Sequence, residues 1–297
     1  MDSLSSPIVV CRPAIKRDYE DVKEFCKTIW NGHDYVPMVW GDWFKDPHGF
    51  FATAEYKGHA IGCAKVTLLS ESQWWFEGFR VDPNHQGLKI GSHIHGYIDQ
   101  WWVKNGDGVA RLMTNAKNLH VQHLCNKLGF EKVGEALGFI AEPLNEEVNT
   151  FELTNDIKQF AAFARASESI KSMNQLVDFG WRIAELNESS LSSFSRVDKD
   201  FGQKLYWWKD RQGLFATWED DDDGVPVLGV SVVACDMKDM SALLMDIRRM
   251  AAKGNYKNVL WIMNTFPQIF PVLEESGYQQ KWENVGVVFE KRSRAGG

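Results

Sequence analysis

One stretch constrains the fold of this chain more than any other: residues 74–91, WWFEGFRVDPNHQGLKIG. It begins with aromatic residues, valine and one glutamate, as a β-strand does, and it breaks at Asp82-Pro83-Asn84. A short loop with two glycines follows, and apolar residues then recur at helical spacing, namely Ile94, Tyr97, Ile98, Trp101 and Trp102. A strand, a loop whose amides can point one way and a helix N-terminus form a cradle for an anion. The stretch therefore predicts an anion site.

Strands and helices are predicted on both sides of this stretch. Before it we expect a short edge strand at residues 8–10, a helix from Asp18, a second helix from about Pro37, and strands at 50–55, 60–69 and 72–81. After it we expect a strand at 110–115, a helix capped by Asn118 and ended by Gly129, and a strand at 131–144. This order predicts an α/β (or α+β) fold with a central sheet flanked by helices.

Composition excludes several classes of protein. A chain of 297 residues is long enough for two domains, and its net charge of −7 argues against a nucleic-acid surface. No apolar run approaches the roughly 20 residues that cross a bilayer, and the N-terminus lacks the features of a signal peptide. The five cysteines are odd in number and widely spaced, which indicates reduced thiols and no zinc site. We therefore expect a soluble cytoplasmic protein without a metal.

The second half of the chain echoes the first. Arg182 precedes Leu191 and Phe194 much as Arg12 precedes Val22 and Phe25, and Gly277-Tyr278 stands where Gly129-Phe130 stood. We expect a domain at 1–145, a linker with one helix around 157–166 inside 146–174, and a diverged second copy at 175–297.

The second copy lacks the anion cradle. Residues 235–240 connect its strand and helix without a glycine and with two acidic side chains, which would repel a pyrophosphate. The acidic run 219–223 lacks calcium-loop spacing and is expected at a solvated hairpin tip. One working site, in the first domain, is the prediction.

Four pieces of the first half together resemble the GNAT N-acetyltransferase superfamily. That family has a strand ending in V-x-P, a loop Q/R-x-x-G-x-G/A and a helix N-x-x-A-x-x-L-Y-x-x-x-G-F. The matching residues here are Val81-Asp82-Pro83, then Gln86-Gly87-Leu88-Lys89-Ile90-Gly91, then Asn118 and Leu128-Gly129-Phe130. The resemblance spans about residues 8–144, and it implies a GNAT fold, acetyl-CoA as cosubstrate and no metal.

A narrower resemblance is to the histidine N-acetyltransferases of vertebrates, which also carry a second, diverged domain. It rests on short segments: Asn31-Gly32-His33-Asp34-Tyr35-Val36-Pro37, Trp43, Asp46, Glu77-Gly78-Phe79-Arg80-Val81 and Ala110-Arg111-Leu112. This likeness implies a free amino acid as the acetyl acceptor.

Two positions depart from the GNAT pattern. Lys89 replaces the first motif glycine, so it is strained if the backbone there needs a positive φ, or else its amine adds a cation near a phosphate. Cys125 replaces the tyrosine that serves many relatives as general acid toward the leaving thiolate. We assign Cys125 no such role, and the thiolate leaves unaided or takes a proton from water.

The resemblance assigns cosubstrate contacts to ten residues. The loop amides would hold the pyrophosphate of coenzyme A, and the edge of the preceding strand would pair with its pantetheine arm. One strand amide would also stabilise the oxyanion. The residues are Phe79, Arg80, Val81, Gln86, Gly87, Leu88, Lys89, Ile90, Gly91 and Asn118.

Glu77 is the candidate general base. It is the only carboxylate in an aromatic segment, whose neighbours are expected to raise its pKa toward neutrality. The alternative is that strand alternation points Glu77 to solvent. Asp34, Tyr35 and Trp75 are candidate acceptor contacts, although Asp34 also suits a turn or cap. Arg80 could meet an acceptor carboxylate, but a surface strand position is favoured.

The sequence thus predicts an N-acetyltransferase that acts on a small-molecule amine, such as the amino acid histidine. Two alternatives stay open. One is acetylation of a protein N-terminus or lysine. The other is a non-catalytic acyl-CoA-binding module, which the replacements at Lys89 and Cys125 would favour.

Overall fold

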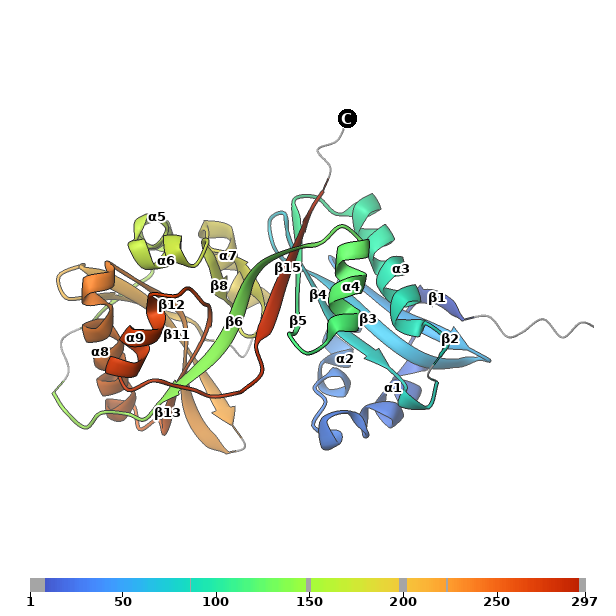
Figure 1. The fold of residues 1–297 in the computed structure, drawn as a ribbon, viewed down its shortest axis with the longest axis horizontal. Coiled ribbons are helices and arrows are strands. Elements are labelled where there is room, and N and C mark those ends of the chain that lie inside the picture. The colour runs from blue at the N-terminus through green and yellow to red at the C-terminus, as the bar shows by residue number, and fades with distance from the viewer. Residues whose placement is uncertain (1–8, 86, 148–150, 198–201, 223, 294–297) are drawn as a thin grey trace, which may run out of the picture.

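The strands of the molecule join into one twisted sheet that runs through both halves of the chain (Figure 1). The computed structural model describes residues 9–293 apart from 86, 148–150, 198–201 and 223. Within these residues the sheet has 15 strands, and its main path is β1-β2-β3-β4-β5-β15-β6-β13-β12-β11-β10-β7.

The first half follows the predicted order of elements. They are β1 (Val10–Pro13), α1 (Asp18–Cys26), η1 (Ile29–Gly32), α2 (Val36–Lys45), β2 (Phe50–Tyr56), β3 (His59–Ser70), β4 (Gln73–Val81), η2 (Pro83–His85), α3 (Ile90–Asn105), β5 (Val109–Asn115), α4 (Leu119–Lys127) and β6 (Glu131–Ala141). The first strand begins at Val10, later than predicted, and Ile8 lies outside the described residues.

Alternating side chains divide the helices of the first half between the two faces of the sheet. Ala52 and Ala64 pack in an apolar cluster with Ile94 and Ile98 of α3, whereas Phe51 and Cys63 pack in another with α1 and α2. Because neighbouring residues of a strand point to opposite faces, the helix pair α1–α2 and helix α3 cover different faces.

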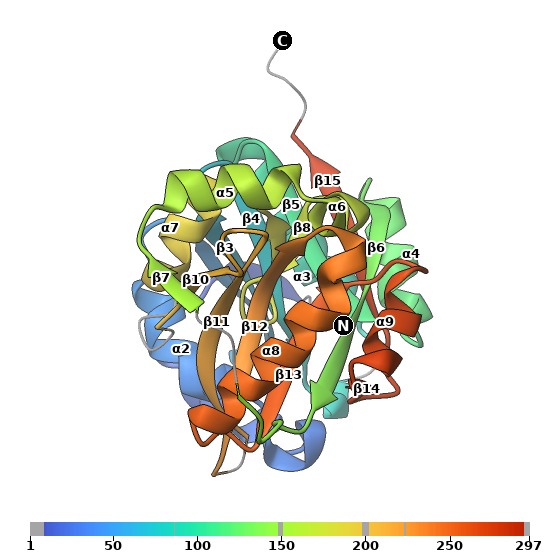
Figure 2. The same ribbon diagram turned by 90° about the vertical axis from the view of Figure 1, so that its left-hand side faces the viewer.

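The second half repeats the alternation of strands and helices. Its elements are β7 (Phe151–Thr154), α5 (Ile157–Ala166), α6 (Glu168–Ser172), β8 (Leu176–Asp178), β9 (Ile183–Glu185), α7 (Glu188–Val197), β10 (Lys204–Trp208), β11 (Gly213–Asp222), β12 (Val225–Cys235), η3 (Met237–Asp239), α8 (Met240–Lys253), β13 (Asn258–Asn264), α9 (Ile269–Glu275), β14 (Gln279–Gln280) and β15 (Gly286–Arg292). Figure 2 shows α8 lying across β12 and β13. The acidic run is at a hairpin tip as predicted, with Asp223 outside the described residues.

The segment predicted as a linker is packed onto the second half. Its helix α5 has the predicted bounds, but β7 also pairs with β10, and the Ser169 hydroxyl donates to Val233 O at 3.0 Å. The domain boundaries at 145 and 175 stay a prediction.

The two halves exchange strands. Strand β15, the last strand of the described residues, is antiparallel to both β5 and β6 and lies between them. Strand β6 in turn pairs with β13 of the second half. Figure 1 shows β6 and β15 side by side where the two halves meet. Each half is therefore completed by a strand from the other.

Strands β4 and β5 separate after three pairs. Their parallel pairing covers Gln73↔Val109 to Trp75↔Arg111, and among the described residues the rest of β4 pairs with β3 alone. A bulge at Gly78, where φ is +66°, bends β4 at the same place.

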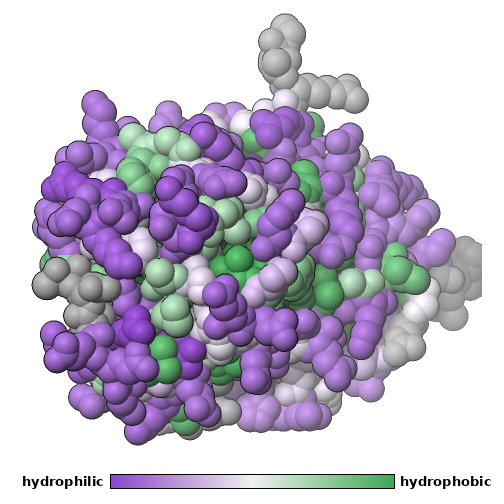
Figure 3. Space-filling view, turned by 60° about the vertical axis from the view of Figure 1, so that its left-hand side comes forward, coloured by the Kyte–Doolittle hydropathy of each residue, from purple (hydrophilic) through white to green (hydrophobic). Residues whose placement is uncertain are grey.

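Every helix in the described residues is too short or too polar to reach across a lipid bilayer. The face in Figure 3 is covered mainly by hydrophilic side chains, with smaller apolar groups near its centre. All five cysteines are free thiols.

Candidate active site

The predicted strand, loop and helix are present. After β4 the Asp82 carboxylate accepts from Asn84 N at 2.9 Å and so forms the turn that begins η2. Gly87 has a φ of +83°, and α3 begins at Ile90, whose side chain is buried. Gln86 lies outside the described residues. The loop thus brings the chain from the end of β4 to the N-terminus of α3, where helices attract anions.

Lys89 adopts a left-handed backbone conformation, which a glycine adopts without strain. Its φ is 53° and its ψ is 28°, in the left-handed region, and it directly precedes α3. A side chain in this region costs about 1 kcal/mol relative to glycine. The sequence left strain and phosphate contact as alternatives for Lys89. Its backbone conformation is strained, its side chain is exposed, and the phosphate contact stays a prediction.

The freed edge of β4 is the part that the resemblance assigns to the pantetheine arm. Phe79 packs its ring against His95 of α3, with centroids 4.5 Å apart. Beyond Trp75 this edge faces the gap between β4 and β5. This edge could pair with an added strand, in the sense of β-augmentation, although Phe79 O already accepts from Arg80 Nη1 at 3.0 Å.

Glu77 is buried and does not point to solvent. The residue is 8% exposed. One carboxylate oxygen accepts from Thr67 Oγ1 at 2.5 Å, and the other meets Arg182 Nε at 3.2 Å. The alternative of a solvent-facing Glu77 is therefore wrong. Its hydrogen-bond partners are polar side chains, which the prediction of aromatic neighbours did not include.

Arg80 and Asp34 form a buried ion pair. Arg80 donates from Nε and Nη2 to the two oxygens of Asp34, at 2.5 and 3.1 Å. The Arg80 side chain is 10% exposed, so the prediction of a surface strand residue is wrong. Asp34 also accepts from Val36 N at 3.1 Å, which confirms its turn role at the start of α2. Both of its oxygens already bind Arg80, and the role of Asp34 as an acceptor contact stays a prediction.

Tyr35 and Trp75 lie in different surroundings. The Tyr35 ring meets Trp43 edge-on at 5.9 Å, and burial, followed by the nearby charge of Glu77, raises the pKa of its hydroxyl. Trp75 is buried in the apolar cluster that also contains Phe139 and Val177. The structure thus brings Tyr35 close to Glu77 and places Trp75 in the core between the halves. Their roles as acceptor contacts stay predictions.

Sequence reasoning missed two cations beside Glu77. Arg182 comes from the second half of the chain and no motif marked it. Lys65 is fully buried in β3, where it donates to Asp46 Oδ2 at 2.5 Å and to Val66 O at 2.9 Å. Burial lowers the pKa of Lys65, and Asp46 opposes this shift. A lysine within the apolar run of residues 60–69 was a signal that could have identified the second cation.

The helix α4 carries the other two motif positions. Asn118 caps it, accepting from Val121 N at 3.3 Å, as predicted. Cys125 is fully buried in the apolar cluster under α3, and burial raises the pKa of its thiol to about 12. That Cys125 has no role as an acid stays a prediction.

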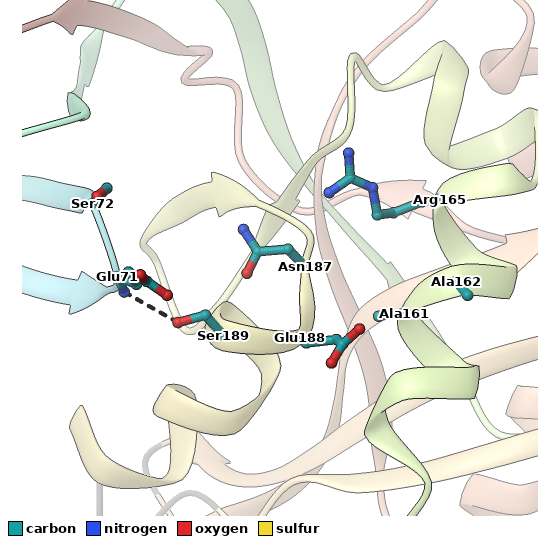
Figure 4. Close-up of a pocket in the computed structure, with 8 residues that line it drawn as sticks. All are labelled: Glu71, Ser72, Ala161, Ala162, Arg165, Asn187, Glu188 and Ser189. Carbon is teal, nitrogen blue, oxygen red and sulfur yellow. Dashed lines mark hydrogen bonds between the residues drawn. The ribbon is translucent and has the colours of Figure 1, made fainter.

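A separate cavity of about 420 Å³ lies at the opposite end of β4 (Figure 4). It is bounded by the β3–β4 turn, α5 and the start of α7, where Glu71 N donates to Ser189 Oγ at 3.1 Å. None of the predicted site residues lines it. Among the described residues no group of three His, Cys, Asp or Glu side chains could hold a metal ion.

Comparison with sequences of known proteins gives a match in the first half. Residues 15–130 match the model of the Acetyltransferase (GNAT) family. A human protein described as "Probable N-acetyltransferase 16" is 26% identical over 97 residues, which are 32% of this chain. The match covers 26% of that relative's length.

Solved structures resemble nearly the whole chain. A GCN5-related N-acetyltransferase from Sphaerobacter thermophilus has a TM-score of 0.62 at 13% identity, over 97% of this chain and 96% of that one. A tandem GNAT protein from the clavulanic acid biosynthesis pathway has a TM-score of 0.61 at 10% identity, over 97% of this chain and 100% of that one. At such identities the likeness shows the fold, and the predicted GNAT fold with a second, diverged half is confirmed. Residues 15–130 thus match the GNAT family model, and nearly the whole chain has a fold similar to that of solved GNAT proteins.

Proposed function

We propose that this protein is an acetyl-CoA-dependent N-acetyltransferase that acts on the amine of a small molecule. The family match and the fold indicate an N-acetyltransferase. The observation that carries the proposal is the freed edge of β4, which ends at a glycine-containing loop and helix N-terminus and has the buried Glu77 beside it. An acyl-CoA bound along this edge and loop would have its thioester close to an amine beside Glu77.

Acetyl-CoA would bind along the loop and the strand edge. The amides of residues 87–91 lie at the N-terminus of α3, the positive end of its dipole, and would hold the pyrophosphate. The backbone of Phe79, Arg80 and Val81 would pair with the pantetheine arm. One of these amides would face the acetyl carbonyl and stabilise the oxyanion that forms on it.

The reaction would be a direct transfer. The neutral amine attacks the thioester carbonyl carbon, the new C–N bond forms, and the amine proton passes to Glu77. The C–S bond then breaks and the thiolate of coenzyme A leaves. Because the Cys125 thiol is buried, with a pKa of about 12, the thiolate takes any proton from water.

An amino acid is the proposed class of acceptor. The proposal rests on the resemblance to histidine N-acetyltransferases in residues 31–37 and 77–81, and the matched human relative is named as an N-acetyltransferase. Histidine itself is the first acceptor to test. Acetylation of a protein N-terminus or lysine is the second candidate within the same reaction, and the cytoplasmic location stays a prediction.

The test is a thiol-release assay with acetyl-CoA over a panel of amino acids, amines and peptides. We expect turnover with at least one amino acid. Glu77→Gln should lower kcat by about 10²- to 10⁴-fold, the range for loss of a general base, and should alter the acidic limb of the pH profile. Glu71→Gln, at the exposed β3–β4 turn, is the matched control and should keep wild-type rates.

Binding is measured separately by thermal shift. A ligand at 100 times its Kd stabilises the native state by about 2.7 kcal/mol, and Glu77→Gln should keep this effect of acetyl-CoA. Stabilisation without turnover on any acceptor would identify a non-catalytic acyl-CoA binder. An unchanged pH profile in Glu77→Gln would remove Glu77 from the role of base.

A further inference from the structure

A guanidinium from the second half of the chain reaches the proposed active site of the first. We propose that Arg182 binds the carboxylate of the acceptor, so that the acceptor is an amino acid or another amine that carries a carboxylate. The inference rests on the proposed function, because it names the substrate class of the same site. Two observations support the inference: the hairpin that contains Arg182, and the ion pair that Arg182 forms with Glu77.

The hairpin β8–β9 places Arg182 at its tip. Its strands pair from Leu176↔Glu185 to Asp178↔Ile183, and Phe179 N donates to Arg182 O at 2.8 Å across the turn. The two central residues, Gly180 and Trp181, have φ values of +65° and +66°. A two-residue turn with both φ values positive matches the twist of a hairpin but disfavours a tryptophan. The tip is thus held in a defined and strained shape next to Arg182.

Side chains of β4 fix the hairpin against the first half. Gln73 donates to Glu185 O at 2.9 Å and accepts from Glu185 N at 2.7 Å, so its amide binds the backbone of β9 twice. Residues 73, 75 and 77 of β4 point to one face of the strand. One end of the hairpin is therefore bound at Gln73, and the other end reaches Glu77 through Arg182, at 3.2 Å.

The pair is arranged for an amino acid. Arg182 and Glu77 have side chains that are 14% and 6% exposed, so both charges are largely removed from water. Their opposite charges lie side by side, as the amine and carboxylate of an amino acid do. A guanidinium has five N–H donors in a planar fork and can bind a carboxylate with two of them while it keeps a bond to another. The acceptor carboxylate would lie on Arg182, and its amine would then face Glu77.

The other arginine near the site is not suited to this task. Arg80 already donates to both oxygens of Asp34, and its guanidinium lies over the Trp30 ring, 4.3 Å from the centroid. Binding a substrate through Arg80 would break a buried pair. Carboxylate recognition is therefore assigned to the second half of the chain, which would explain why a half without its own anion loop remains joined to the site.

The test compares acceptors that differ only in the carboxylate. Each free amino acid of the standard set is compared with its α-amide as the acceptor. The value of kcat/KM for both acceptors is measured with wild type, Arg182→Gln, Arg182→Lys and the control Arg211→Gln. Arg211 is exposed on the second half and binds Glu152, far along the sheet in β7. Circular dichroism and the melting temperature show that each variant is folded.

We expect wild type to prefer the amino acid over its amide. Arg182→Gln should lower kcat/KM for the amino acid by about 10- to 100-fold, as for the loss of a charged hydrogen bond, and should change the rate with the amide far less. Arg182→Lys should recover part of the loss, and Arg211→Gln should behave as wild type. An equal loss on both acceptors, or no loss at all, would overturn the proposal.

A binding measurement distinguishes failure of this inference from failure of the proposed function. Thermal shifts by the amino acid and by its amide are measured with coenzyme A present, for wild type and Arg182→Gln. A shift by the amino acid that Arg182→Gln abolishes supports the inference even if no acceptor turns over, in which case only the proposed activity fails. Equal shifts by amino acid and amide, or no shift by either in wild type, overturn it.

Discussion

At the scale of single residues, Gly78 determines the shape of β4 beside the proposed site. Its φ of +66° lies where side chains are strained, and a Cβ there would come within 2.4 Å of Trp43 Cη2. The bulge thus brings the backbone of β4 directly against the α2 helix. Only glycine satisfies both conditions.

Gly78→Ala should lower the free energy of unfolding by about 2–5 kcal/mol, because it combines left-handed strain with overpacking. Urea denaturation followed by tryptophan fluorescence measures the change. Gly41→Ala is the matched control, since a Cβ at Gly41 of α2 would meet no atom within 4 Å. That variant should be as stable as wild type or more stable by about 0.5–1 kcal/mol. Equal stability of the two variants would contradict the role of Gly78.

Asp178 is a buried carboxyl beside the turn of the Arg182 hairpin. Burial raises its pKa from 3.8 to about 8, against hydrogen bonds from backbone amides of the turn, among them Gly180 N to Oδ2 at 3.1 Å. The native state therefore keeps a proton that the unfolded chain loses at a lower pH. This group's contribution to stability must fall as pH rises from about 4 to about 8.

Asp178→Asn, which cannot ionise, should remove this part of the pH dependence. Compared with wild type, the variant should gain more than about 1.4 kcal/mol of stability between pH 5 and pH 9, the equivalent of one pKa unit. Melting temperatures at the two pH values measure the gain. Asp42→Asn, on the exposed side of α2, should show no gain, and an identical pH dependence in wild type and Asp178→Asn would refute the assignment.

Single residues also show which predictions from the sequence were right and which were wrong. The strained Lys89 and the capping Asn118 followed from the motif, because local backbone geometry depends on residues close in sequence. Arg80 was assigned to the surface because alternation does not show which face of a strand another element covers. Here Asp34, Trp30 and Tyr35 cover it.

At the scale of elements, β15 completes the first half of the sheet. Its Glu290 binds Arg111 of β5, at 2.8 Å from Nε and 2.7 Å from Nη2, and the Arg111 side chain is only 2% exposed. Lys291 of the same strand reaches Asp99 of α3 at 2.6 Å. Two buried charges of the first half thus depend on the last strand of the chain.

Glu290→Gln should destabilise the protein by about 3 kcal/mol, because it leaves a buried guanidinium without its charged partner. Chemical denaturation of the full chain measures the loss. Glu219→Gln breaks the exposed pair with Lys204, whose side chains are 59% and 51% exposed, and should cost less than about 1 kcal/mol. Similar effects of both substitutions would show that β15 is not held through Arg111.

At the scale of the whole molecule, strand exchange makes the two halves one folding unit. A fragment that ends at residue 145 lacks β15, so β5 and β6 lose the strand between them. A fragment that begins at residue 146 lacks β6, the partner of β13. Each fragment would expose unpaired strand edges and apolar surface.

We therefore expect residues 1–145 and 146–297 to aggregate or to melt without cooperativity when each is produced alone. Produced together, they should form a stable one-to-one complex, because the missing strands then complete each other. Size-exclusion chromatography and thermal melts followed by circular dichroism measure both outcomes. A monomeric 1–145 fragment that melts cooperatively would contradict the exchange and support two independent domains.

The sequence by itself determined most elements, the fold class and the position of the anion loop. These features depend on periodicity, turn residues and motif spacing, which are local along the chain. The tertiary structure alone decided the strand exchange between β6 and β15 and the meeting of Arg182 with Glu77, residues 105 positions apart. Local patterns cannot specify such contacts, because they depend on how the two halves pack on one another. The acceptor side of the proposed site is therefore a property of the whole fold, while its cosubstrate side is already present in the motif.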